Sequence, residues 1–173
     1  MTAIPEIMTQ RLIIGPFKPE HLKSFLSFML DHESTKYLMF SPEQKTVEGA
    51  TGLLEYIISS YSTKEPVQSL AITMEDGTYV GSCGFSPIEK DKVCECYYSI
   101  NRAYRGNGYA VEATRALINH IFKNTPYSEV RAYTHPNNSF SGTVARKLGM
   151  EYMGEQLHPI FENTGVLYRL IRD

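Results

Sequence analysis

The segment from Asn101 to Ala113, NRAYRGNGYAVEA, constrains the fold more than any other stretch of the sequence. Its glycines, Gly106 and Gly108, separate a tyrosine-rich apolar run typical of a strand from a run with helical periodicity. Glycine adopts backbone torsions that a side chain obstructs, and it lets a ligand approach the main chain. A helix that begins after such a bend offers unpaired N–H groups and a positive dipole end, which bind phosphate oxygens. The segment therefore predicts either an anion site or a tight turn with no ligand.

Arg105 stands directly before this bend and adds a permanent charge suited to a phosphate. Two well-known phosphate motifs do not match the segment. A dinucleotide-binding turn needs a third small residue in G-x-G-x-x-G, where this chain has Val111, and it follows the first strand of a parallel unit. A Walker loop ends in G-K-[ST], which this segment lacks. We therefore exclude a dinucleotide fold and a P-loop.

The composition is that of one globular domain, which we expect to span residues 1–173. Hydrophobic residues make up 42% and charged residues 21%, which excludes disordered and fibrous classes. The net charge of -2 provides no broad basic field, so neither nucleic acid nor an anionic membrane is an expected partner. The N-terminal residues do not match a signal peptide and no apolar run could span a bilayer, which predicts a cytoplasmic protein.

The order of periodic segments predicts an α/β fold. Expected strands cover residues 10–17, 67–74, 78–88, 93–100, 128–135, 151–157 and 165–171. Expected helices cover 18–32, 41–61, 108–124 and 137–150, with Ser41 as a helix N-cap and Gly149 as a C-terminal cap. Strands come first as a meander and are later separated by helices. This order predicts a mixed, mostly antiparallel sheet of about seven strands with helices on both faces.

Two long segments carry a more specific pattern. Residues 94–122 contain the glycine bend, and residues 130–155 contain NNSFSGTVARKLGM. The first is similar to the [QR]-x-x-G-x-[GA] pyrophosphate loop of the GNAT superfamily of acyl-CoA N-acyltransferases, and the second is similar to that family's N-x-x-S-x-x-V-x-x-K-L-G-[FM] segment. The opening TQRLIIGPFKPEHLKSF also resembles the branch that contains ribosomal-protein N-terminal acetyltransferases. The resemblance covers nearly the whole chain and implies a single-domain GNAT-like fold.

The resemblance implies that acetyl-CoA is the cosubstrate. It places the pyrophosphate on backbone amides, which in this sequence are those of Arg105, Gly106, Asn107, Gly108, Tyr109 and Ala110. It also implies that the pantetheine arm follows the strand before the loop, where a main-chain N–H near Ser99 or Ile100 holds the thioester carbonyl. Asn138 would contact the pantetheine amides and Ser141 would lie near the sulfur. Asn138 is equally typical of a turn and a helix N-cap.

Transfer of an acetyl group to an amine needs a deprotonated amine, a polarised carbonyl and a proton for the departing thiolate. Glu95, on the strand before the loop, is the candidate general base, and Glu162 is a second candidate. Either residue is also explained as an exposed or paired glutamate. Many members of the family carry a tyrosine acid where this chain has Ala145, so we assign the acid role to Ser141. Its alternative role is to cap the helix or to contact the pantetheine.

Other residues are expected to be structural or depart from the family pattern. Ala103 stands at the first position of the pyrophosphate motif, with Arg102 beside it, which weakens one anchor of that loop. Direct transfer needs no enzyme thiolate, so we expect three free structural cysteines and no metal site. We also expect three tyrosines to lie in the sheet core, and we leave the lone His135 off the catalytic residues. The cysteines are Cys83, Cys94 and Cys96, and the tyrosines are Tyr97, Tyr98 and Tyr133.

The resemblance implies an N-acetyltransferase that acts on a primary amine, either a protein N-terminus or a small amine, without a covalent enzyme intermediate. The alternative is a CoA-binding sensor or pseudoenzyme with the same fold, because the missing tyrosine leaves the chain without the family's common proton donor. Glu33, Glu43 and Glu48 would attract a cationic acceptor such as a polyamine or an aminoglycoside, and they equally fit a solvated helix face. A monomer and a homodimer are both compatible with the sequence.

Overall fold

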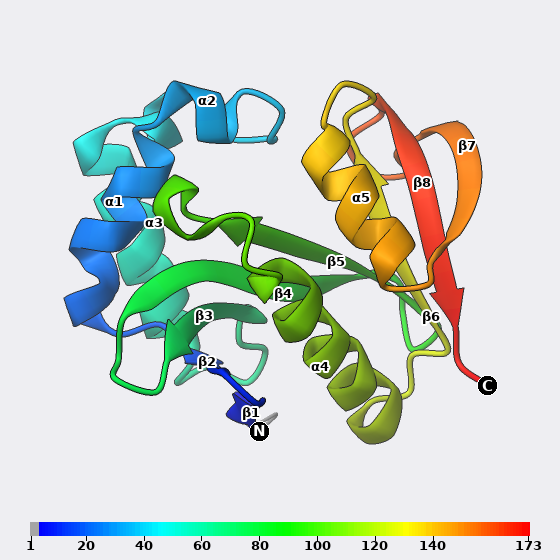
Figure 1. The fold of residues 1–173 in the computed structure, drawn as a ribbon, viewed down its shortest axis with the longest axis horizontal. Helices are drawn as coiled ribbons and strands as arrows, with labels where there is room; N and C mark the ends of the chain where they lie inside the picture. The colour runs from blue at the N-terminus through cyan, green and yellow to red at the C-terminus, as the bar shows by residue number, and fades with distance from the viewer. Residues whose placement is uncertain (1–3) are drawn as a thin grey trace.

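A single mixed sheet organises the computed structural model, which describes residues 4–173 (Figure 1). Its eight strands lie in the order β1-β2-β3-β4-β5-β6-β8-β7. They are β1 (Ile7–Met8), β2 (Leu12–Pro16), β3 (Ser69–Met74), β4 (Tyr79–Glu89), β5 (Val93–Ile100), β6 (Glu129–Thr134), β7 (Glu151–Leu157) and β8 (Thr164–Ile171). Neighbours pair antiparallel except β5 and β6, which pair in parallel. The predicted fold class is confirmed, and β1 is an additional strand whose two residues are too few to show periodicity.

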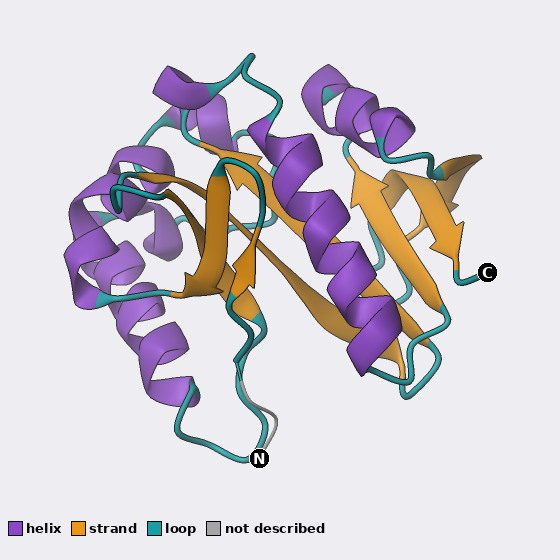
Figure 2. Cartoon of the chain, turned by 60° about the horizontal axis from the view of Figure 1, so that its bottom comes forward, coloured by secondary structure: helices purple, strands orange, loops and turns teal. Residues whose placement is uncertain are grey.

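Helices cover both faces of this sheet (Figures 1 and 2). On one face lie α1 (Leu22–Met29) and α3 (Val47–Ser60), with the one-turn α2 (His32–Thr35) between them in sequence. On the other face lie α4 (Tyr109–Asn124) and α5 (Ser139–Lys147). Short 3-10 turns occupy Pro19–His21, Glu43–Lys45 and Arg102–Tyr104. Each group of helices packs on its own set of buried side chains, so the sheet separates two cores.

The helix predicted over residues 41–61 begins later than expected. The N-cap of α3 is Thr46, whose Oγ1 accepts the N–H of Gly49 at 3.1 Å. Ser41 instead pairs with Gln44 ahead of the 3-10 turn: its Oγ accepts the N–H of Gln44 at 3.2 Å. A Cβ on Gly49 would lie 1.7 Å from the carbonyl oxygen of Glu43, so the turn crosses the helix where only glycine fits. The predicted C-terminal cap of α5 is confirmed, since Gly149 has φ +80°.

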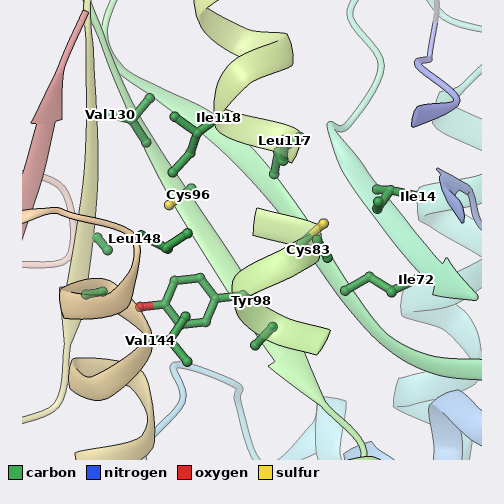
Figure 3. Packing of buried hydrophobic residues seen from close by; sticks show 14 of the residues in the cluster. Ile14, Ile72, Cys83, Cys96, Tyr98, Leu117, Ile118, Val130, Val144 and Leu148 are labelled. Carbon is green, nitrogen blue, oxygen red and sulfur yellow. The ribbon is translucent and has the colours of Figure 1, made fainter. Parts of the chain in front are cut away.

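Alternation along β5 divides its side chains between the two cores. Tyr98 and Cys96 point to the face covered by α4 and α5, where Figure 3 shows them among Leu117, Val144 and Leu148. Cys83 and Cys94 belong to the same core, and all three cysteines are buried and free. Burial raises the pKa of Cys83 and Cys94 to about 12, which suppresses the thiolate. The other face of β5 carries Glu95, Tyr97 and Ser99 toward α1 and α3.

Strands β5 and β6 separate after a short parallel contact. Only Val93, Cys94 and Glu95 of β5 have partners on β6, although β5 continues to Ile100 and β6 to Thr134. Figure 1 shows the two strands together at one end and apart at the other, where α5 and the loop after β5 flank them. Beyond Glu95 the edge of β5 therefore has no strand partner on this side, and this gap positions the candidate site.

Candidate active site

The loop between β5 and α4 presents a row of free backbone donors. Gly106 and Gly108 both have φ +79°, and α4 begins directly after them. Among residues 4–173, the N–H groups of residues 106–111 have no hydrogen-bond acceptor. The N–H of Arg105 donates instead to the carbonyl oxygen of Arg102 at 3.3 Å, so the free donors begin one residue later than predicted. Free N–H groups at the positive end of a helix dipole fit a phosphate.

Arg11, directly before β2, holds this loop in place through a set of polar contacts that we call the clamp. Its Nη1 donates to the carbonyl oxygen of Asn107 at 2.9 Å, and its Nε and Nη2 contact Oε2 of Glu112 at 2.7 and 2.6 Å. Glu112, in the first turn of α4, also accepts the hydroxyl of Thr9 at 2.7 Å. Burial alone would raise the pKa of Glu112, but the hydrogen bonds from Thr9 and Arg11 lower it. Sequence reasoning missed this clamp because Arg11 and Glu112 are 101 residues apart.

The side chain of Arg105 turns away from the free N–H groups. Its Nε donates to the carbonyl oxygen of Ile100 at 3.0 Å, and its Nη2 donates to Ser34 Oγ at 3.1 Å. Its guanidinium also lies over the Phe140 ring, 5.7 Å from the ring centroid. Arg105 therefore joins the end of β5 to the segment around α2. Its neighbour Arg102 pairs with Asp31 at 2.8 Å on the surface.

Two cavities follow the chain from this loop into the gap. The loop cavity, about 200 Å³, is lined by Gly106, Gly108, Thr143 and Lys147, among others. The central cavity, about 400 Å³, lies between the end of β5 and the start of α5 and is lined by Ser141 and others. The two share walls formed by Ile100, Arg105 and Phe140. A ligand with an anionic group on the loop N–H groups and a narrow chain in the gap would fit this path. Lys147, which lines the loop cavity, is a cation that sequence reasoning missed.

The edge of β5 adds two backbone donors to the central cavity. Asn101 N–H donates to Val80 on the β4 side at 2.9 Å. Because N–H groups alternate along a strand, that of Ser99 also faces β4, whereas those of Tyr98 and Ile100 face the gap. Of the two predicted carbonyl-binding amides, the geometry favours Ile100 and adds Tyr98. The Ser99 hydroxyl is 3.1 Å from that of Ser82.

The start of α5 closes the other side of the central cavity. Asn138 is the N-cap, and its Oδ1 accepts the N–H of Ser141 at 3.2 Å. The Ser141 hydroxyl has no hydrogen-bond partner within the part of the chain that the structure describes, and Ser141 lines the cavity. Tyr98 donates its hydroxyl to the carbonyl oxygen of Ser141 at 2.8 Å, and burial raises its pKa. Ala145 is fully buried and brings no hydroxyl here. Ser141 therefore brings a largely buried hydroxyl, without a partner in the described chain, to this wall of the cavity.

Glu95 is paired with His158, a residue that sequence reasoning missed. Its Oε2 is 2.8 Å from His158 Nε2, and His158 is 4% exposed in the loop after β7. His158 Nδ1 accepts the N–H groups of Ile160 and Phe161, each at 3.1 Å. With Nδ1 used as an acceptor, the proton of the neutral ring lies on Nε2 and is donated to Glu95. The backbone therefore fixes the tautomer that holds the carboxylate.

The environment of Glu95 suits a general base. Burial raises the pKa of the Glu95 carboxyl above its ordinary value, and the hydrogen bond from His158 opposes part of that rise. A carboxylate with a raised pKa accepts protons more readily near neutral pH. The second predicted base, Glu162, is exposed, and it does not line the cavity that contains Glu95. Of the two general-base candidates that the sequence left open, the geometry therefore favours Glu95 over Glu162.

Glu95 lines a third cavity, of about 420 Å³, on the α1 and α3 side of β5. We call it the aromatic cavity because Tyr97, Tyr133 and Phe161 are among its lining residues. It shares Tyr98 and Ser99 with the central cavity, so the two meet at the gap between β5 and β6. Of the tyrosines predicted to lie in the core, only Tyr98 does. Tyr97 and Tyr133 are not buried, and they line the aromatic cavity on the other face of the sheet.

No helix within residues 4–173 has the length and apolar character needed to cross a bilayer. In the same residues, no group of three or more His, Cys, Asp or Glu side chains is placed to hold a metal ion.

Known proteins resemble this chain in sequence and in fold. The family model for the acetyltransferase (GNAT) domain matches residues 11–151. YkkB of Bacillus subtilis (strain 168), an uncharacterized protein, is 40% identical over 78 residues, which span 44% of this chain and 45% of YkkB. The chain therefore matches less than half the length of that relative. The uncharacterized N-acetyltransferase p20 of Bacillus licheniformis is 25% identical over 149 residues, or 86% of this chain and 83% of p20.

A solved structure shares the fold over nearly the full length. RimL, a ribosomal L7/L12 alpha-N-protein acetyltransferase in complex with coenzyme A, aligns with a TM-score of 0.80 and 17% identity, covering 98% of this chain and 99% of RimL. At this identity the likeness concerns the fold alone. The match of the family model over most of the sequence, together with this fold, shows that the chain belongs to the GNAT acetyltransferase family.

Proposed function

We propose that the protein transfers an acetyl group from acetyl-CoA to a primary amine by direct attack, without a covalent enzyme intermediate. One observation carries the proposal: the cavities that begin at the free N–H groups of residues 106–111 lead through the gap to a partly buried carboxylate, Glu95. A site of this kind holds a donor on one side of the sheet gap and an amine on the other. In this arrangement the two substrates meet at Tyr98 and Ser99.

The residues of the loop and central cavities fit the donor. The N–H groups of residues 106–111 would hold the pyrophosphate, with Lys147 as a nearby cation. The arm would pass Asn138, whose Oδ1 caps α5 and leaves its amide N–H₂ group to serve as a donor. The N–H groups of Ile100 and Tyr98 would bind the thioester carbonyl oxygen. A preorganised donor of this type is worth about 3–4 kcal/mol in the transition state.

Proton transfers on each side of the gap are assigned to separate residues. Glu95 accepts a proton from the ammonium group of the acceptor, directly or through water, and His158 orients the carboxylate for this step. The free amine attacks the carbonyl carbon and the carbon–sulfur bond breaks. The attacking nitrogen gives up its second proton to water, and the Ser141 hydroxyl relays a proton from that water to the departing thiolate. Burial suppresses the thiolate form of the cysteines, which supports a mechanism without an enzyme thiolate.

Two classes of acceptor follow from this chemistry. RimL, which shares the fold, is named as an acetyltransferase of a ribosomal protein N-terminus, so a protein N-terminus is one class. A small amine is the other. A CoA-binding sensor with the same fold is the alternative function, and the fully buried Ala145 at the position of the expected tyrosine favours it.

Release of the CoA thiol from acetyl-CoA, measured with a panel of amines, tests the proposal. We expect amine-dependent release at a 1:1 ratio with acetylated product. Glu95→Gln should lower the rate about a hundredfold to ten-thousandfold, the usual contribution of a general base. Glu162→Gln is the matched control, because Glu162 is an exposed glutamate outside the cavity, and its rate should equal that of the wild type. Tight binding of CoA without release by any amine would establish the sensor instead.

A further inference from the structure

We propose that the acceptor is a small primary amine with a single positive charge and an aromatic or other bulky apolar body. The inference rests on the proposed acetyl transfer and names its acceptor class. It is carried by the aromatic cavity, which opens beside Glu95 and meets the central cavity at Tyr98 and Ser99. A volume of about 420 Å³ has room for an arylalkylamine, since pockets for small ligands start at about 300 Å³.

The walls of the aromatic cavity come from both halves of the chain and are largely apolar. The helix α1, the segment 37–40, α3, β5, β6 and the loop after β7 all contribute. Six of the aromatic residues are Phe28, Tyr37, Phe40, Tyr97, Tyr133 and Phe161. Aromatic side chains bury a ligand ring with favourable edge and face contacts. A flexible hydrophilic chain would gain little from these walls.

The charged side chains that line the aromatic cavity also restrict the class of ligand that it can bind. Of the lining residues in the described chain, Glu95 is the one carboxylate, and none is a lysine or an arginine. The predicted attraction of a polycation by Glu33, Glu43 and Glu48 has no counterpart here. Glu33 pairs with Lys36 at 2.7 Å beside the central cavity, and Glu43 and Glu48 are exposed and outside these cavities.

The charge count therefore separates acceptor classes. One ammonium group can be matched by Glu95, but a second ammonium group in an apolar cavity would lose its hydration without a partner. A ligand carboxylate would meet the same penalty, because no lysine or arginine of the described chain lines the cavity. Of its two histidines, His158 is hydrogen-bonded to Glu95 and His135 is stacked on Tyr37. Polyamines, aminoglycosides and free amino acids are disfavoured for these reasons. An apolar monoamine matches both the single carboxylate and the apolar walls of the cavity.

The loop after β7 offers a matched pair of variants. Ile160 and Phe161 are neighbours, 56% and 57% exposed, and the N–H of each donates to His158 Nδ1 at 3.1 Å. Only Phe161 lines the cavity, and its ring centroid lies 4.8 Å from that of His158. Replacing either side chain by alanine keeps the backbone donors to His158. Phe161→Ala should therefore affect an aromatic acceptor, and Ile160→Ala controls for the loss of an exposed apolar side chain.

Matched ligands provide the test, with thiol release and calorimetric titration of the CoA-loaded protein as separate readouts. 2-Phenylethylamine is compared with L-phenylalanine, which adds a carboxylate, and hexylamine with 1,6-diaminohexane, which adds a charge. Peptides with N-terminal serine or phenylalanine complete the panel. We expect each monoamine to bind more than about tenfold more tightly than its charged counterpart, which corresponds to about 1.4 kcal/mol. Phe161→Ala should raise the KM for 2-phenylethylamine severalfold, and Ile160→Ala should leave it unchanged.

The outcomes separate the two proposals. Turnover of the diamine, L-phenylalanine or the peptides in preference to the monoamines would overturn the acceptor class and leave acetyl transfer standing. Binding of the monoamines with the expected selectivity, but without thiol release by any amine, would support the cavity assignment and overturn the transfer reaction. Equal KM values for 2-phenylethylamine in Phe161→Ala and the wild type would remove the aromatic wall from recognition.

Discussion

Replacing Gly106 by alanine separates the binding role of the loop from its role in folding. Gly106 has φ +79°, and a Cβ built there meets nothing within 4 Å, so the substitution introduces backbone strain without a clash. An L-residue in the left-handed region costs about 1–2 kcal/mol, and a smaller unfolded-state entropy offsets about 0.4–1 kcal/mol of that. We therefore expect a net loss of about 1 kcal/mol of stability. At this chain length that lowers Tm by about 2–4 °C.

The effect on CoA binding should be larger than this strain. If the loop relaxes toward negative φ, at least one N–H of residues 106–111 turns away from the pyrophosphate. A hydrogen bond to a charged group contributes about 1.5–3 kcal/mol, so the Kd for CoA should rise about tenfold to a hundredfold. Isothermal titration calorimetry with CoA measures this change, and thermal melting measures the stability.

Gly77→Ala is the matched control for this experiment. Gly77 has φ +88° in the turn between β3 and β4, and a Cβ there also meets nothing within 4 Å. Both variants should melt at similarly reduced temperatures, and only Gly106→Ala should bind CoA weakly. Wild-type affinity in Gly106→Ala, or an equal loss of affinity in both variants, would refute the assignment of the loop as the pyrophosphate site.

Three further predictions concern the clamp, the acid and a cysteine. Glu112→Gln removes the charge that pairs with Arg11, so it should weaken CoA binding severalfold. It should lower the free energy of unfolding, measured by chemical denaturation, by about 1 kcal/mol or less, because the pair is partly exposed. Unchanged CoA affinity would show that the clamp does not shape the loop. Ser141→Ala should lower the single-turnover rate of transfer about a hundredfold or more with acetyl-CoA affinity nearly unchanged, and an unchanged rate would remove Ser141 from the mechanism. Cys96→Ala should lower stability by about 1–2 kcal/mol through lost packing and keep full turnover in the folded fraction; a folded variant that binds acetyl-CoA and has no turnover would contradict direct transfer.

Local signals in the sequence were enough to predict the loop and most elements around it. The spacing of Gly106 and Gly108 between a strand and an amphipathic helix predicted a bend with free N–H groups, and both glycines have positive φ. Alternation and helical periodicity predicted seven of the strands and the core of each long helix. The predicted start of α3 was wrong because serine is the stronger N-cap residue, so the sequence favours Ser41 over Thr46. The helix begins at Thr46 because the backbone of Glu43 packs directly against Gly49, a contact that the sequence pattern does not reveal.

The residues that sequence reasoning missed depend on contacts between distant segments. His158 lies 63 residues from Glu95, and nothing in either local pattern indicates that they meet. The side chain of Arg105 had been expected to face the phosphate, but the free carbonyl of Ile100 at the edge of β5 binds it instead. The aromatic cavity exists because β5 and β6 separate after Glu95, and that separation has no signature in the sequence of either strand.

A single-turnover experiment across pH tests the central claim most directly. Wild-type and Glu95→Gln proteins are mixed with acetyl-CoA and the best acceptor of the panel, and both products are quantified by mass spectrometry. Because the base must be deprotonated and its pKa is raised by burial, the wild-type rate should fall with decreasing pH through a midpoint above the ordinary glutamate value. Glu95→Gln should be slow and lack this limb, and acetylated amine should equal released CoA in both proteins. CoA release without acetylated amine, or the same acidic limb in Glu95→Gln, would contradict the proposed site.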